Sequence, residues 1–186
     1  MTEDKITGKR IYIKQLKTGD VNQKYLNWIN DKKLTKYMEC RWNIYSMDDL
    51  KDYVKNLKKT NEYLFGIFRV DNDDYIGNIK IGPVDIRYKK GDIGFFIGDE
   101  NSRGKGYATE AIELIVCFAF EELNLNKVTA GCYSENIGSE KSLIKNGFKL
   151  AGVFKEDCIF NNEFIDCFKF ELLKKEWELN KIRGNN

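Results

Sequence analysis

The chain has 186 residues, of which 42% are hydrophobic and 13% aromatic, enough for one domain with a sizeable core. Its formal net charge is only +2, so no large positive field points to nucleic acid or to an anionic membrane. The apolar run Ile115 to Phe120 is far too short to span a bilayer, and residues 1–5 lack the layout of a signal peptide. We therefore expect a cytoplasmic protein without nucleic-acid or membrane partners.

The residue types also restrict the chemistry. Histidine is absent, which removes Ser-His-Asp and Cys-His nucleophile pairs, histidine metal sites and a histidine general base. The five cysteines form no C-x-x-C pair and are odd in number, so neither a zinc knuckle nor a disulfide framework is indicated. We expect no metal. Proton transfer must use carboxylates, Ser, Tyr, Lys, Cys or water.

The first half of the chain predicts a strand, two helices and a hairpin. Alternating apolar residues indicate strands, and apolar residues three or four apart indicate helices. Ser46 and Asp49 are a capping-box variant that starts the second helix, which we expect to end near Thr60. The acidic turn 71–74 suits an antiparallel hairpin. The predicted elements are a strand over 9–16, helices capped by Thr18 and Ser46, and strands over 63–70 and 75–86.

The second half alternates strands with helices. Gly147 closes the later helix, and Asn161-Asn162 resembles a two-residue hairpin turn. The elements are a strand over 93–97, a helix over 106–123, a strand over 127–133, a helix over 136–145, and strands over 148–154, 157–160 and 163–170. With a single proline and no linker, the chain reads as one domain over 1–186 with a core of about 9–174. This order predicts an α+β fold whose mixed, mostly antiparallel sheet is flanked by helices.

A basic, glycine-rich turn at 103–106 lies between the strand at 93–97 and the helix that follows. Gly104 and Gly106 let the backbone approach an anion, and the first-turn N–H groups of the helix have no intrahelical partners. The glycine spacing differs from a Walker loop, and Thr109 stands where a dinucleotide fingerprint needs its third glycine. The turn therefore predicts a phosphate-binding loop of another kind.

This loop resembles the pyrophosphate loop of the GNAT superfamily of N-acetyltransferases, whose pattern is Arg or Gln, two residues, Gly, one residue, and Gly or Ala. Other segments are also similar to the family, and the C-terminal part is similar to its RimJ/RimL-like branch. The similar segments are Arg103-Gly-Lys-Gly-Tyr-Ala108, Thr109-Glu-Ala111, Asn136-Ile-Gly-Ser139, Asn146-Gly-Phe148, Gly152-Val-Phe154, and Leu173-Lys-Lys-Glu-Trp177 together with Asn162 and Asp166. The resemblance implies the GNAT fold and acetyl-CoA as the acetyl donor.

The resemblance also assigns residues to the donor. The pyrophosphate would bind the loop, the pantetheine arm would pair with the end of the strand before it, and the next helix would contact the arm from its far side. These cofactor-binding residues are Arg103, Gly104, Lys105, Gly106, Tyr107 and Ala108 in the loop, Phe96, Ile97 and Gly98 on the strand, and Asn136 and Ser139 on the helix. Asn136 is equally well suited to cap that helix.

The resemblance identifies the catalytic groups less directly than the donor-binding residues. Many family members carry an acid Tyr where this chain has Leu143, so Ser139, Tyr133 or an ordered water would protonate the leaving thiolate. The base would be a carboxylate, and the candidates are Glu39, Glu156 and Asp157. The acceptor would lie against Tyr37, Glu39, Arg41 and Trp42. Glu110 we assign to the positive end of its helix.

The resemblance implies acetyl transfer from acetyl-CoA to a primary amine by direct attack. By this resemblance the acceptor would be a protein N-terminal α-amine or a small amine such as a polyamine or an amino sugar. The alternative is a sensor or structural module that binds acetyl-CoA without turnover. The stripe Phe164, Phe168 and Phe170 predicts sheet packing, with a homodimer contact as the other reading.

Overall fold

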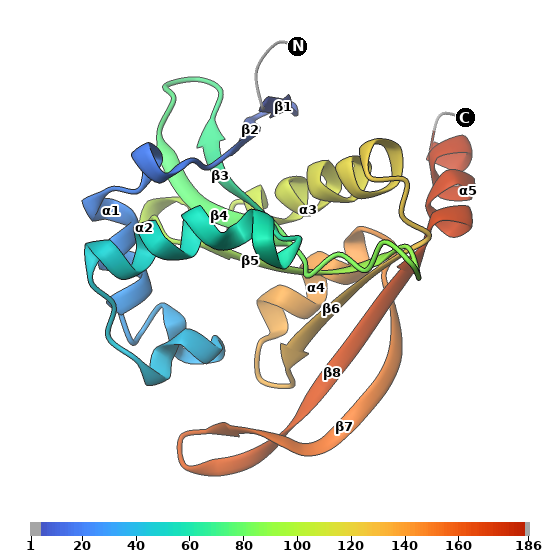
Figure 1. Cartoon of the computed structure of the whole chain (residues 1–186). Coiled ribbons are helices and arrows are strands. Elements are labelled where there is room, and N and C mark those ends of the chain that lie inside the picture. The colour runs from blue at the N-terminus through green and yellow to red at the C-terminus, as the bar shows by residue number, and fades with distance from the viewer. Residues whose placement is uncertain (1–4, 185–186) are drawn as a thin grey trace.

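The computed structural model describes residues 5–184, and in them one sheet contains eight strands (Figure 1). The strands are β1 (Lys5–Thr7), β2 (Ile11–Gln15), β3 (Tyr63–Arg69), β4 (Tyr75–Ile81), β5 (Lys90–Ile97), β6 (Lys127–Tyr133), β7 (Lys149–Phe160) and β8 (Glu163–Leu173). Their spatial order is β1-β2-β3-β4-β5-β6-β8-β7. Among these strands only β5 and β6 run parallel, which confirms the mixed, mostly antiparallel sheet.

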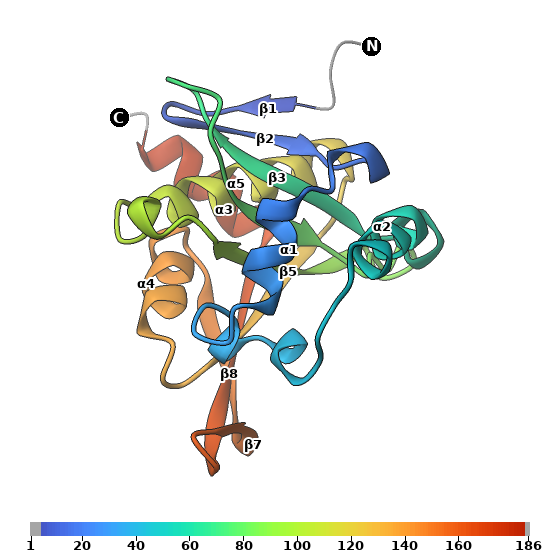
Figure 2. The same ribbon diagram turned by 90° about the vertical axis from the view of Figure 1, so that its left-hand side faces the viewer.

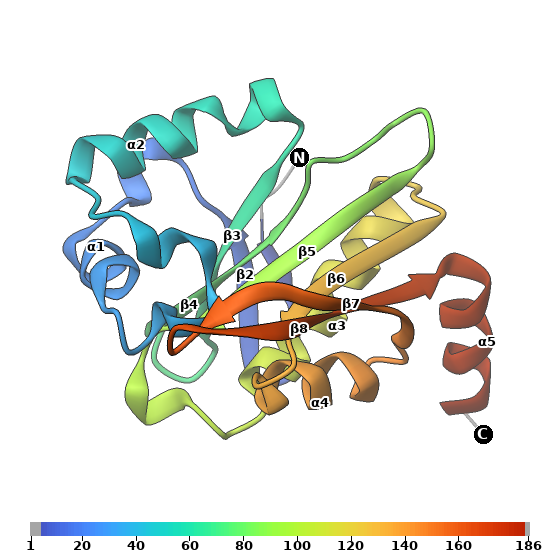
Figure 3. The same ribbon diagram turned by 90° about the horizontal axis from the view of Figure 1, so that it is seen from below.

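Helices cover both faces of this sheet. They are α1 (Gln23–Asn30), α2 (Met47–Asn56), α3 (Tyr107–Cys117), α4 (Ile137–Lys145) and α5 (Lys174–Gly184). Figure 3 places α1 and α2 on one side of the sheet and α3 and α4 on the other. The long β7–β8 hairpin projects beyond the rest of the fold (Figures 1 and 2). No described helix is both long and apolar enough to span a membrane.

Strand alternation divides the apolar side chains between two cores. On β3, Phe65 packs into the larger core beneath α3, while its neighbour Leu64 packs into a smaller core with α1 and α2. Phe95 and Phe96 divide in the same way on β5. Successive strand residues point to opposite faces, so a strand covered on both faces must be apolar at consecutive positions.

Local signals predicted several element ends correctly. Ser46 and Asp49 form the predicted capping box at the start of α2. Asn161 and Asn162 both have positive φ, which confirms the two-residue hairpin turn. Gly147, with φ of 83°, ends α4 as expected.

Other ends differ from the predictions. Asn22 caps α1 by accepting from the Tyr25 N–H, and Thr18 instead starts a short 3-10 turn. The strand expected to reach residue 86 ends at Ile81, because Gly82 turns the chain with a φ of 139° before Pro83. Outside the expected core of 9–174, β1 pairs with β2 and α5 packs Trp177 against Phe120. The sequence around β1 and α5 carries too little hydrophobic periodicity to reveal either element.

Three further differences concern lengths. The helix predicted to reach residue 123 is regular only to Cys117 and continues as a π-type turn over Phe118–Glu122. The strands expected at 148–154 and 157–160 are one strand, β7, interrupted by irregular pairing. Phe170 is buried and Phe168 packs against the larger core, whereas Phe164 is exposed near the hairpin tip. The reading of residues 1–4 as lacking a signal peptide lies outside the described residues.

Glu110 ties the start of α3 to β2 rather than only facing the positive end of its helix. Its carboxylate accepts from the backbone N–H groups of Arg10 at 2.7 Å and Ile11 at 3.2 Å, and from the Arg10 Nε at 2.9 Å. Burial raises the pKa of Glu110, but the hydrogen bonds from Arg10 and Ile11 outweigh burial and leave the pKa lowered. Glu110 thereby fixes the start of α3, and the loop before it, against β2.

We expect Glu110→Ala to lower the free energy of unfolding by about 3 kcal/mol, because it leaves two backbone N–H groups and a guanidinium without their acceptor. In a chain of this size that is a fall in Tm of roughly 6–12 °C. A lowered folded-state pKa contributes stability above the ordinary Glu value and loses it as the pH falls. The difference from wild type in thermal unfolding should therefore shrink below about pH 4.5. Glu113→Ala, exposed on the same helix, is the matched control and should change Tm little.

Candidate functional site

The sheet opens between β5 and β6. The two strands pair only from Lys90 to Ile93 on β5 and from Lys127 to Ala130 on β6. Beyond that point β5 stays with β4 as far as Ile97, and β6 stays with β8. The backbone groups that face the gap are therefore unpaired by the sheet, and they offer an extended ligand a row of donors and acceptors.

A cavity of about 1020 Å³ lies over this opening. Its lining combines the segment between α1 and α2, the ends of β5 and β6, the start of α4 and the β7–β8 hairpin. It brings together seven predicted site residues: Tyr37, Glu39, Phe96, Tyr133, Asn136, Ser139 and Asp157. It does not bring in Ile97, Gly98, Arg41, Trp42, Glu156 or the loop residues 103–108. Residues as distant in the sequence as Tyr37 and Asp157 thus face one space.

The glycine-rich loop has the backbone that an anion requires. Gly104 has a φ of 72° and Gly106 a φ of 82°, a region that L side chains rarely adopt. No side chain caps α3, so its first-turn N–H groups remain available to a ligand. The Arg103 guanidinium, however, donates to the carbonyls of Ile97 and Gly98, so it braces the loop from within. A second basic residue, Arg10, donates to the Lys105 carbonyl at 2.8 Å.

At the start of α4, Asn136 acts as the helix cap. Its Oδ1 accepts from the Ser139 N–H at 3.3 Å. Both residues also line the cavity, so capping and ligand contact are compatible. Within the described chain the Ser139 hydroxyl donates to no other residue. Leu143, one turn further on, is fully buried in the larger core and faces away from the cavity.

Four predicted residues form a polar cluster beside the hairpin. The Tyr133 hydroxyl donates to Glu39 and accepts from Arg41 Nη1 at 2.7 Å, and Arg41 Nη2 donates to the Ile159 carbonyl at 2.7 Å. Burial and the hydrogen bond to Glu39 raise the pKa of Tyr133 to about 12, against the opposing effect of Arg41. Trp42 is exposed and lies under the Arg41 guanidinium. Arg41 therefore joins the segment after α1 to the hairpin, as the approach of the two in Figure 3 illustrates.

The lining includes a carboxylate that sequence reasoning missed. Asp92 on β5 lies next to Ile93, where the pairing with β6 ends, and its carboxylate accepts from the Thr129 hydroxyl at 2.7 Å. Although Asp92 is open to the cavity, surrounding protein partly removes it from bulk water, and this burial raises its pKa despite Thr129, Lys169 and Lys80. The available signal was an acidic residue in an otherwise apolar strand that leads directly into the glycine-rich loop.

A buried amide also faces the cavity. Asn78 on β4 is 2% exposed, and its Oδ1 accepts from the Tyr75 hydroxyl at 2.6 Å. Its Nδ2 has no hydrogen-bond partner among the described residues. A buried donor without a partner is uncommon, because the lost hydration is not replaced. Asn78 is therefore suited to donate to a bound water or ligand.

Comparisons with known proteins identify the family of this chain. A family model described as an acetyltransferase (GNAT) domain matches residues 10–149. The chain is 31% identical over 92% of its length to an uncharacterized N-acetyltransferase YnaD of Bacillus subtilis, covering 98% of that protein. It is 26% identical over 55% of its length to the ribosomal-protein-serine acetyltransferase of Escherichia coli, covering 56% of it.

A solved structure has the same fold. It is the spermidine N-acetyltransferase from Vibrio cholerae in complex with CoA and spermine, with a TM-score of 0.81 and 21% identity, covering 92% of this chain and 99% of that one. At this identity the likeness concerns the fold alone. It confirms the predicted α+β architecture.

Proposed function

The chain belongs to the GNAT acetyltransferase family and uses acetyl-CoA as its donor, and we propose that it acetylates a small, positively charged primary amine. The observation that carries the proposal is the charge around the cavity. Among the described residues that line it, four are carboxylates, Glu39, Asp49, Asp92 and Asp157, against the two ammonium groups of Lys80 and Lys169. Aromatic rings complete much of the remaining wall, and ring faces attract cations.

The residues present fit the donor. The uncapped start of α3 and the two left-handed glycines offer N–H groups to the pyrophosphate. The unpaired edge of β5 near Phe96 suits the pantetheine arm, with Asn136 on the other side of the opening. These assignments of Arg103 to Ala108, Phe96 to Gly98, and Asn136 are part of the proposal. Bound in this way, the thioester would face the cavity.

The acceptor must lose a proton before it attacks. An alkylamine with a pKa of about 10.4 is neutral in only about one molecule in 2,500 at pH 7, a deficit of about 4.6 kcal/mol. We assign the base role to Asp92, because its raised pKa makes it a better proton acceptor than an ordinary surface carboxylate. Asp157 and Glu39 also line the cavity and are the competing candidates. Glu156 is exposed outside the lining and is the least favoured.

The reaction then needs one bond made and one broken. The amine nitrogen, which has given one proton to the base, forms a bond to the thioester carbonyl carbon, and the carbon–sulfur bond breaks. The departing thiolate takes up a proton from the acid, and the proton that the nitrogen still has to lose restores the acid. Ser139 is the donor we favour, because its hydroxyl is not committed within the described residues, whereas Tyr133 already donates to Glu39. A thiol pKa of about 8.5 makes the thiolate a tolerable leaving group, so the demand on this acid is moderate.

Ser139→Ala is expected to lower kcat by about tenfold to a hundredfold, with little change in the affinity for acetyl-CoA. Steady-state assays that follow release of the free thiol of CoA measure this effect. Ser142→Ala on the same helix is the matched control, because Ser142 donates to the Gly138 carbonyl and does not line the cavity. An undiminished kcat for Ser139→Ala would remove it from the acid role and leave Tyr133 or water.

An acceptor screen tests the proposed substrate class. Thiol release is measured with diamines and polyamines, amino sugars, and peptides with a free N-terminus. We expect the highest kcat/KM for short amines that carry a second positive charge. Preference for N-terminal peptides would overturn this choice and support membership of the RimJ/RimL-like branch. Binding of acetyl-CoA without turnover of any acceptor would favour the sensor reading. The cytoplasmic location and a homodimer remain predictions.

A further inference from the structure

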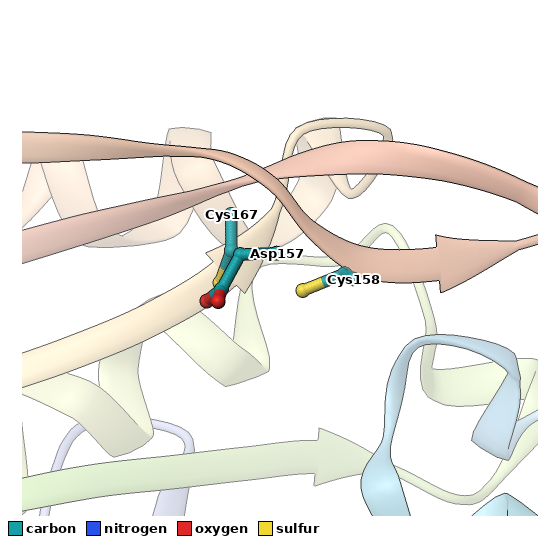
Figure 4. A group of neighbouring side chains, drawn as sticks. All are labelled: Asp157, Cys158 and Cys167. Carbon is teal, nitrogen blue, oxygen red and sulfur yellow. The ribbon is translucent and has the colours of Figure 1, made fainter.

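Three potential metal ligands converge where the β7–β8 hairpin meets the cavity. They are the Asp157 carboxylate and the Cys158 thiol on β7 and the Cys167 thiol on β8. One ligand atom from each lies within 4.8 Å of the other two. Figure 4 shows the Cys158 sulfur pointing toward the Asp157 carboxylate and the Cys167 side chain. All three residues line the cavity.

A break in strand alternation brings the first two together. Neighbouring residues of a regular strand point to opposite faces, so Asp157 and Cys158 would normally diverge. Between Phe154 and Cys158, however, the pairing with β8 shifts register, and Glu156 has a φ of 55°. Such bulges re-aim side chains and are frequent beside functional sites. Here the bulge lets two consecutive ligand side chains face the same space.

From this convergence we propose that Asp157, Cys158 and Cys167 form an inhibitory binding site for a thiophilic divalent cation such as Zn²⁺. Two thiolates and a carboxylate are ligands that zinc accepts. Tetrahedral zinc, with bonds of about 2.3 Å to sulfur and 2.0–2.2 Å to oxygen, holds its ligand atoms roughly 3.4–3.8 Å apart. The three ligand atoms lie within 4.8 Å of one another, so side-chain rotations that move them by about 1 Å would bring them to the spacing that zinc requires. A fourth position stays open toward the cavity.

The position of the site determines its effect. A cation there would occupy part of the acceptor end of the cavity and engage the Asp157 carboxylate. With two thiolate ligands the site keeps a net charge of −1, so the amine would be excluded by the loss of space and of a carboxylate partner, not by repulsion. This consequence rests on the proposed function, whereas metal binding itself does not. The cation inhibits the reaction and takes no part in the chemistry.

Binding is tested on the full chain, reduced and stripped of metal. Titration with Cd²⁺, a zinc surrogate, should give one equivalent of an ultraviolet thiolate-to-metal charge-transfer band, and Zn²⁺ should compete it away. Removing a residue that only hydrogen-bonds to a metal ligand already weakens metal binding by about tenfold or more. Cys158→Ser and Cys167→Ser should therefore each weaken Cd²⁺ binding by more than about tenfold. Cys117→Ser, on α3 outside the cavity lining, is the control and should bind like wild type.

The outcomes separate this proposal from the proposed function. No charge-transfer band, or a band that survives both cysteine substitutions, overturns the metal site. Once an active acceptor is known, Zn²⁺ should inhibit wild type and Cys117→Ser at similar concentrations. Inhibition of Cys158→Ser should need a Zn²⁺ concentration more than about tenfold higher. Adding a chelator should restore the activity of the inhibited enzymes. Zn²⁺ binding without inhibition would overturn the inhibitory role, while the metal site itself would stand. Failure of every amine acceptor overturns the proposed function while the Cd²⁺ titration still decides the site.

Discussion

Asp92→Asn should lower kcat/KM at pH 7 by about a hundredfold to a thousandfold, in the lower part of the range expected for loss of a general base. Asn keeps the size of the side chain and can still accept from the Thr129 hydroxyl, so the site geometry is preserved. What is lost is a carboxylate whose burial raises its pKa and makes it a stronger proton acceptor. The measurement is a pH profile of kcat/KM with the best amine from the acceptor screen.

The two enzymes should differ in their response to pH. Wild-type activity falls as the pH drops through the raised pKa of Asp92, since the protonated carboxyl cannot accept a proton. The variant should recover near pH 9.5, because a growing fraction of the amine is then neutral without assistance. Glu39→Gln and Asp157→Asn provide the comparison. A pH-selective loss in one of them, with Asp92→Asn near wild type, would move the base to that residue.

Stability separates a catalytic role for Asp92 from a structural one. A raised folded-state pKa means that the ionised carboxylate is less favourable in the folded protein than in the unfolded chain. Asp92 therefore contributes stability below its ordinary pKa and loses it as the pH rises through the folded pKa. Asp92→Asn should accordingly have a higher Tm than wild type at neutral pH, and the difference should vanish in acid. Lower activity together with a lower Tm would indicate damage to the fold instead.

Gly104→Asp should weaken CoA binding by roughly a hundredfold relative to Gly104→Asn. Both residues tolerate the left-handed conformation better than other side chains, and an added Cβ at Gly104 meets no atom within 4 Å. The two variants differ only in one negative charge beside the proposed pyrophosphate site. At about 4 Å, one pair of like charges costs about 1 kcal/mol in water and about 4 near a protein surface. A hundredfold weakening of CoA binding corresponds to about 2.7 kcal/mol, which repulsion from the two phosphate charges can supply.

Calorimetry with CoA at two salt concentrations measures this pair of variants. The difference in CoA affinity between Gly104→Asp and Gly104→Asn should become smaller at high salt, because exposed charges are screened. Equal affinities at low salt would show that the phosphates bind elsewhere. Thermal unfolding is the control for the fold. The two melting temperatures should agree, since the side chains have similar size and the same backbone requirement.

Features that depend on a few neighbouring residues could be predicted from the sequence. Ser46 and Asp49 encode their capping box, and Asn161-Asn162 encodes a hairpin turn, because each is decided by contacts or conformational preferences inside one short segment. Gly104 and Gly106 encode the left-handed turns of the loop in the same way. The periodic apolar residues of α3 determined which face is buried. These local signals were sufficient to predict the α+β order and the left-handed glycines of the loop before α3.

Features that depend on distant segments were decided only by the tertiary structure. Asp92 and Glu156 are both acidic strand residues, yet the end of the β5–β6 pairing places one in the cavity and a bulge leaves the other outside it. Cys158 and Cys167 converge because that bulge reverses alternation, and Arg103 folds back onto carbonyls of the preceding strand instead of extending from the loop. A side chain's direction in a sheet has a period of two, so a single inserted residue reverses it. The sequence determined which groups were available, and packing between remote strands determined which of them meet.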